Sequence, residues 1–224
     1  MTERPRLLTL MGSGETAPTM AKVHRLVAER LGPAPVDVVL LDTPYGFQEN
    51  ADEISRRAVG YLGRSMGMPV QVASWRVLGG DLWLRERALE LVRGADLVFA
   101  GPGSPTYALR VWQEGCLGDV LAGKLTRGGA VTFGSAAAAC LGIATVPVYE
   151  IYKVGADPHW VPGLDLLAGL GLWTRCEPPL PVSVPSPRPH RGASRYPCRR
   201  CTLRCSGWRA PSTQGWTRAT SPRQ

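Results

Sequence analysis

Short apolar runs alternate with amphipathic segments over the first three-quarters of the chain. The apolar runs are rich in β-branched residues, which is typical of buried strands. Between them, apolar residues recur every three or four positions, as on one face of a helix. This pattern predicts strands at residues 7–11, 36–41, 70–73, 97–100, 130–133 and 145–151. It predicts helices at residues 20–31, 50–62, 85–93, 107–114 and 119–126.

This alternation of strands and helices favours one architecture. Strands that read as continuous apolar runs are buried on both faces, and the intervening helices cover those faces. We therefore predict a three-layer α/β domain with a parallel sheet of flavodoxin-like type. Ligands of such sheets bind beyond the carboxyl ends of the strands. Four loops follow strands there, at residues 12–16, 43–47, 101–106 and 134–137, and we expect them to form one site.

The composition agrees with a globular domain. Hydrophobic residues make up 44% of the 224 residues and charged residues 20%, which excludes a fibrous or wholly disordered chain. No apolar run approaches the roughly 18 residues of a membrane span. The apolar stretch at the N-terminus is too short for a signal peptide. We therefore expect a cytoplasmic protein that does not associate with membranes.

The net charge of +8 comes from one part of the chain. Residues 1–172 carry 16 basic and 17 acidic side chains, whereas residues 173–224 carry ten arginines and one acid. The same segment holds nine prolines and only four Leu, Ile, Val or Phe residues, too few for a packed core. We predict an α/β domain at residues 1–172 and an Arg/Pro-rich tail of low order at residues 173–224.

Two explanations of this tail remain open. Arginine without lysine, mixed with Pro, Ser, Cys and Trp, is what a GC-rich gene read out of frame tends to produce, and the domain would then be truncated. The alternative is a genuine basic tail of the kind that contacts nucleic acid, although we expect no nucleic-acid binding. The tail cysteines do not form the paired clusters of a structural zinc site, so we expect no metal. They are Cys176, Cys198, Cys201 and Cys205.

Residues 133–137 form a Phe-Gly-Ser-Ala-Ala motif at the predicted junction of a strand and an Ala-rich helix. A serine on such a sharp turn exposes its hydroxyl, as in a nucleophile elbow. The N–H of Ala136 at the start of the helix and the N–H of Gly103 in a neighbouring loop are candidate oxyanion donors. The alternative interpretation is that Ser135 only caps the helix.

Three segments of the chain resemble a known family. LMGSGE at residues 10–15, FAGPGSPTYAL at 99–109 and GGAVTFGSAAA at 128–138 look like the aspartyl dipeptidase (dipeptidase E)/cyanophycinase family of serine peptidases, in the class I glutamine amidotransferase-like superfamily. The resemblance covers about residues 6–170. It implies a Ser-His-acid hydrolase that acts, without metal or cofactor, on small acidic peptides or isoaspartyl-type bonds. Ser135 then matches the nucleophile, Gly103 the oxyanion loop and Glu150 a functional acid.

The same resemblance places the catalytic histidine at about residues 170–180, where this chain has none. His190 lies in the tail, and we expect His159 in a surface loop rather than as the base. His24 is expected to pack on the first helix. Because a serine without a base is a weak nucleophile, we expect a weak or inactive hydrolase. The second hypothesis is a non-catalytic α/β binding domain with a basic tail that contacts nucleic acid or acidic partners.

Overall fold

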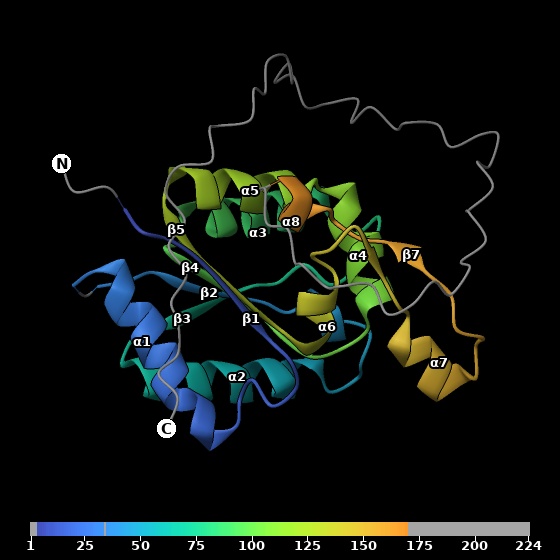
Figure 1. Cartoon of the computed structure of the whole chain (residues 1–224), viewed down its shortest axis with the longest axis horizontal. Helices are drawn as coiled ribbons and strands as arrows, with labels where there is room; N and C mark the ends of the chain where they lie inside the picture. Colours follow the sequence, from blue (N-terminus) through green and yellow to red (C-terminus); the bar gives the residue numbers. More distant parts are fainter. Residues whose placement is uncertain (1–3, 34, 170–224) are drawn as a thin grey trace, which may run out of the picture. The chain divides into compact units, whose positions relative to one another are not determined.

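Parallel strands form a central sheet (Figure 1). The computed structural model describes residues 4–33 and 35–169, and within them the sheet has five strands in the order β1-β5-β4-β2-β3. These are β1 (Arg6–Met11), β2 (Val38–Leu41), β3 (Val70–Ala73), β4 (Leu97–Ala100) and β5 (Gly129–Gly134). Because β1 lies at an edge beside β5, the order differs from the 2-1-3-4-5 of flavodoxin itself. The parallel α/β architecture is confirmed.

Helices cover both faces of this sheet (Figure 1). On one face lie α1 (Ala21–Leu31) and α2 (Ala51–Met66), and on the other lie α3 (Leu82–Gly94) and α5 (Leu117–Arg127), with α4 (Pro105–Glu114) beside α5. Successive side chains of a strand point to opposite faces. Val38 and Leu40 of β2 therefore enter the core with α1 and α2, whereas Val39 and Leu41 enter the core with α3 and α5. Burial on both faces explains why this strand is uninterruptedly apolar.

Residues 145–151 do not form the predicted strand. Only β6 (Ala144–Thr145) is extended, pairing with β7 (Val161–Pro162), and the chain then enters α7 (Val148–Val154). Pro147 precedes this helix, and Gly155 ends it with a left-handed φ of 75°. The N–H of Gly155 bonds to the carbonyls of Glu150 and Ile151. Start and stop residues thus outweigh the β-branched composition of the segment.

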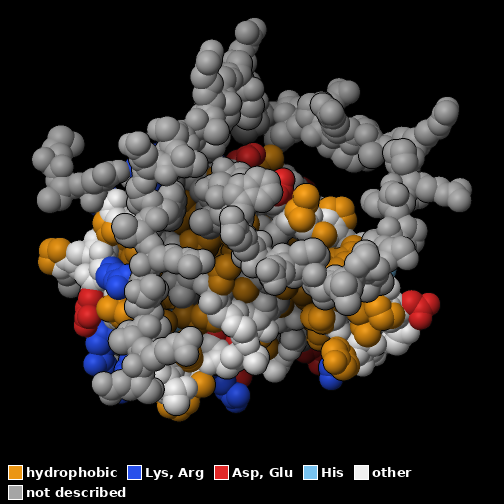
Figure 2. All heavy atoms as spheres, viewed as in Figure 1, with side chains coloured by type: hydrophobic (Ala, Val, Ile, Leu, Met, Phe, Trp, Pro, Cys, Tyr) orange, Lys and Arg blue, Asp and Glu red, His pale blue; other side chains and the backbone are white. Residues whose placement is uncertain are grey.

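The remaining elements are short. They are η1 (Pro18–Met20), η2 (Thr43–Tyr45), α6 (Ser135–Ala139) and α8 (Leu166–Gly169). The segment around α7 leaves large apolar side chains exposed, and Figure 2 shows hydrophobic side chains on the visible face in this region. The most exposed are Ile143, Tyr152, Val154 and Trp160. Since α7 buries no residue fully, polar contacts matter for its attachment to the domain.

Several predictions concern residues outside the described part. The chain divides into units at residues 1–175 and 176–224, and everything described belongs to the first. The Arg/Pro-rich tail, its four cysteines, His190 and the window at residues 170–180 lie outside the described residues. Among the residues that are described, no helix has the length and apolar character needed to cross a membrane.

We expect Leu62→Ala to lower the free energy of unfolding by about 2–5 kcal/mol, because it leaves a cavity between the sheet and α2. Leu62 is 0% exposed and belongs to the core with α1 and α2. Leu78→Ala is the matched control: its side chain is 54% exposed, and we expect a change within about 0.5 kcal/mol. Urea unfolding of the two variants measures the difference. Equal effects would contradict the packing described here.

Candidate active site

The four predicted loops meet at the carboxyl edge of the sheet. Backbone hydrogen bonds join them in pairs, so their positions are fixed relative to one another. The Ser135 N–H donates to the Gly12 carbonyl (2.8 Å), the Ala137 N–H to the Gly101 carbonyl (3.2 Å) and the Ser104 N–H to the Pro44 carbonyl (2.8 Å). The expectation that these loops lie together at one edge of the sheet is confirmed.

Ser135 occupies a strained turn between β5 and α6. Its φ is 49°, in the left-handed region that residues other than glycine seldom adopt. The N-cap residue of α6 is Gly134, and the described chain shows no capping hydrogen bond from the Ser135 side chain. The hydroxyl of Ser135 makes no hydrogen bond to any described residue. A strained, half-buried serine with an uncommitted hydroxyl agrees with the turn that a nucleophile elbow requires, and the nucleophile role of Ser135 stays a prediction.

Cys140 follows Ser135 by five residues, at the C-terminal end of α6, and is fully buried. Its Sγ contacts the carbonyls of Pro105 and Ala136. Burial raises the pKa of the Cys140 thiol well above its usual range. The thiol is therefore not ionised at neutral pH, and it does not compete with Ser135 as a nucleophile.

Two glycines allow the loops to approach this closely. A β-carbon at Gly134 would lie 2.8 Å from Cβ of Glu15. Gly103 has a φ of 141°, and a β-carbon there would overlap the carbonyl of Pro44. The N–H groups of Gly103 and Ala136 make no hydrogen bonds to the described residues, which leaves both predicted oxyanion donors available.

Glu150 joins the site through another side chain. Its Oε1 accepts a hydrogen bond from Ser104 Oγ (3.0 Å), and Ser104 Oγ accepts one from the Tyr107 N–H (3.1 Å) to cap α4. Its Oε2 is buried and has no hydrogen-bond partner among the described residues. No bond links Glu150 to Ser135 within the described part of the chain. The structure thus brings Glu150 to the loop after β4, and the role implied by the resemblance stays a prediction.

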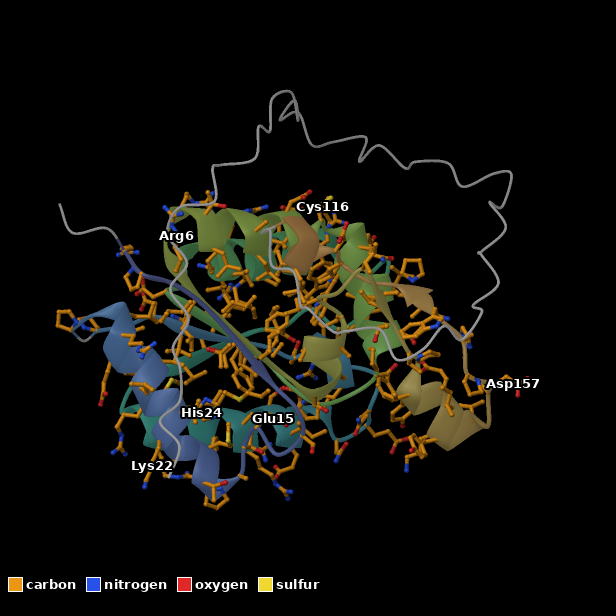
Figure 3. All side chains as sticks on the ribbon, in the orientation of Figure 1. Arg6, Glu15, Lys22, His24, Cys116 and Asp157 are labelled. Carbon is orange, nitrogen blue, oxygen red and sulfur yellow. The ribbon has the colours of Figure 1, made fainter. Side chains whose placement is uncertain are left out.

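The two described histidines do not bond to Ser135. His159 is exposed, and its Nδ1 contacts the carbonyl of Asp157 (2.9 Å), which Figure 3 shows beyond α7. His24 is 2% exposed; its Nε2 donates to the carbonyl of Glu15 (2.7 Å). Its ring meets Tyr61 and Phe99 edge-on, with centroids 5.6 and 5.7 Å away. The packing role predicted for His24 is confirmed.

A buried carboxylate anchors the loop after β2. Asp42 is 0% exposed and accepts hydrogen bonds from Ser74 Oγ (2.9 Å), the Trp75 N–H (3.1 Å) and Arg76 Nε (2.6 Å). Arg76 also pairs with Asp52 (2.7 Å). Burial alone would lower the pKa of Arg76, but the two carboxylates outweigh it and raise that pKa. The charge of Asp42 is therefore fully compensated.

Aromatic side chains lie at the same edge of the sheet. The ring of Phe47 is 5.0 Å from that of Tyr107 and 5.1 Å from that of Tyr149, measured between centroids. The hydroxyl of Tyr107 donates to the carbonyl of Arg76. Burial raises the pKa of Tyr107, and it raises the pKa of Tyr45 to about 12. Both phenols are neutral near pH 7 and supply no base there.

No role was predicted for Glu15, which the structure places at the candidate site. The residue is 4% exposed, and its side chain packs on Gly134 and Gly101. One signal was available: an acid in a loop after a predicted strand, Gly12-Ser-Gly-Glu15. No three His, Cys, Asp or Glu side chains of the described chain are grouped as metal ligands.

The fold is shared with a solved peptidase. No protein-family model matches the chain, and no curated protein matches its sequence. The crystal structure of a peptidase from an acI-B1 actinobacterium is similar with a TM-score of 0.56 and 20% identity, over 74% of this chain. This chain spans 66% of that peptidase, just under two thirds of its length. A candidate peptidase E protein from Listeria monocytogenes EGD-e matches with a TM-score of 0.49 and 14% identity, over 71% of this chain and 74% of that one.

We expect Gly103→Ala to lower the free energy of unfolding by about 2 kcal/mol or more, because the added methyl overlaps the Pro44 carbonyl and the φ of 141° is strained for alanine. Gly12→Ala is the matched control in the same site, since a β-carbon there meets nothing within 4 Å. Chemical unfolding compares the two. If Gly103→Ala is as stable as Gly12→Ala, the loops after β2 and β4 are not in the contact described.

Proposed function

We propose that the chain is a serine hydrolase domain that cleaves peptide or isopeptide bonds of small peptides. The observation that carries this proposal is the backbone of Ser135, whose φ of 49° presents an uncommitted hydroxyl at the carboxyl edge of the sheet. A strained backbone conformation of this kind persists only where the surrounding structure holds it in place, as it often does at catalytic turns. The fold shared with a solved peptidase and the resemblance of three motifs to the dipeptidase E/cyanophycinase family support the same reaction class.

The proposed reaction is acyl transfer to Ser135. Its Oγ attacks the carbonyl carbon of the scissile bond, and the carbonyl oxygen becomes an oxyanion. The N–H groups of Gly103 and Ala136, which have no described partner, would donate to this oxygen; losing one such donor typically costs 10²–10³ in rate. Glu150, held by Ser104, would be the acid that the resemblance assigns. The family's preference for small acidic peptides remains part of the proposal.

We expect slow turnover. Of the two described histidines, one is exposed on its own loop and the other is enclosed by aromatic rings. Neither stands beside Ser135 as the imidazole base of a triad does. Enzymes that lose one triad member retain about 10³–10⁴-fold catalysis over water through binding and the oxyanion hole. A residual activity of that order is what the described site supports.

A serine-directed fluorophosphonate probe tests the nucleophile. Oγ forms a bond to phosphorus, fluoride leaves, and the adduct is located by mass spectrometry of the digested protein. We expect an adduct on Ser135 in the full chain and none at this position in Ser135→Ala. Ser65→Ala, on α2 and 6% exposed, is the matched control and should label as the unaltered protein does. A folded chain that gives no adduct on Ser135 would rule out an activated nucleophile.

A further inference from the structure

The segment that joins β3 to α3 leaves large apolar side chains on the surface. Val77, Leu82, Trp83 and Leu84 are 59%, 48%, 61% and 47% exposed, and we call these four residues the β3–α3 patch. Within the described sheet β3 is an edge strand, so no neighbouring strand covers the patch on its outer side. Exposed apolar patches on soluble proteins mark sites of interaction.

A pocket of about 350 Å³ lies at the patch. Val77 and Leu84 line it together with Trp75, so a large part of its wall is apolar. Trp75 is 4% exposed, and its N–H donates to the buried carboxylate of Asp42 (3.1 Å). This wall of the pocket is therefore held in place within one chain, and the pocket is preformed.

Two charged side chains beside the pocket have no ion-pair partner in the described chain. Arg85, in the pocket wall, pairs with Glu114 (3.4 Å), whereas Asp81, which also lines the pocket, makes no ion pair and accepts the Trp83 N–H (2.8 Å). Arg87 makes none either, and its guanidinium lies over the Trp83 ring, 5.2 Å from the centroid. One surface thus carries a protruding indole with a cation on it and an apolar pocket with an acid beside it.

We propose that the β3–α3 patch is the interface of a two-fold dimer of this chain, in which Trp83 of each copy enters the pocket of the other. The indole meets apolar walls there, and Arg87 on its ring approaches Asp81 of the second copy. Because the indole and the pocket lie on the same surface of one chain, a two-fold axis makes both contacts at once. Both surfaces are then used up, and the assembly closes at two copies.

The residue types at this surface suit the centre of an interface. Tryptophan and arginine are the side chains that most often dominate binding energy between proteins, and here Trp83 and Arg87 are already stacked on each other. The proposal does not depend on the hydrolase function, since it uses the segment after β3, whereas Ser135 is bonded to the loop after β1.

Sedimentation velocity of the full chain over a range of concentrations tests the interface. We expect a monomer–dimer equilibrium in which Trp83→Glu raises the dimer dissociation constant about 30-fold or more, as for loss of an interface hot spot. The new acid stands in the first turn of α3, where the helix dipole favours negative charge, so we expect the variant to fold. Trp160→Glu is the matched control: Trp160 is 64% exposed but directly precedes β7, and its substitution should leave the constant unchanged.

Circular dichroism establishes that each variant compared is folded. A chain that stays monomeric at every concentration overturns the proposal, whether another part of the same chain covers the patch or nothing does. An assembly larger than two copies, a dimer that Trp83→Glu leaves intact, or one that both substitutions weaken equally also overturns it. Should Trp83→Glu not fold, Arg87→Glu decides, since it brings like charges together at Asp81. A rise in the dissociation constant of about tenfold or more supports the proposal, and an unchanged constant overturns it.

Discussion

The close approach of backbone segments at one edge of the sheet is the constraint on which the site depends. Parallel pairing of β5 with β1 on one side and β4 on the other brings their carboxyl ends together. The loops that follow are then near enough to bond through their backbones, and at Gly103 and Gly134 no room is left for a β-carbon. Ser135 adopts its left-handed backbone within this crowded setting, where neighbours on both sides hold the turn.

The crowding at this edge is supported by a core that covers both faces of the sheet. The strands are short and mostly apolar, with Arg6, Thr9, Gln71 and Thr132 as the polar exceptions. Helices on either side bury alternate side chains, and the polar side chains of the candidate site enter where strands end. Asp42, Ser104, Ser135 and Glu15 all stand at or just after strand ends. The fold therefore confines the candidate chemistry to one edge, as expected for a parallel α/β sheet.

Much of this arrangement was predictable from the sequence, because the relevant signals are local. Continuous apolar runs predicted the strands of the sheet with bounds within two residues of those observed, and the predicted ranges 70–73 and 97–100 coincide with β3 and β4. The prediction of a strand at residues 145–151 was wrong, because β-branched residues also occur in a short helix that begins after Pro147 and ends at Gly155. Weighing those two flanking residues would have favoured the helix.

The candidate site was predictable to the level of loops and of Ser135, but not to the level of individual partners. That Ser104 would hold Glu150, or that Glu15 would pack on Gly134, depends on contacts between loops far apart in the chain. Periodicity carries no information on such contacts. Glycine spacing indicated tight turns, whereas the reason for each glycine, a carbonyl or a carboxyl group pressed against it, is visible only in three dimensions.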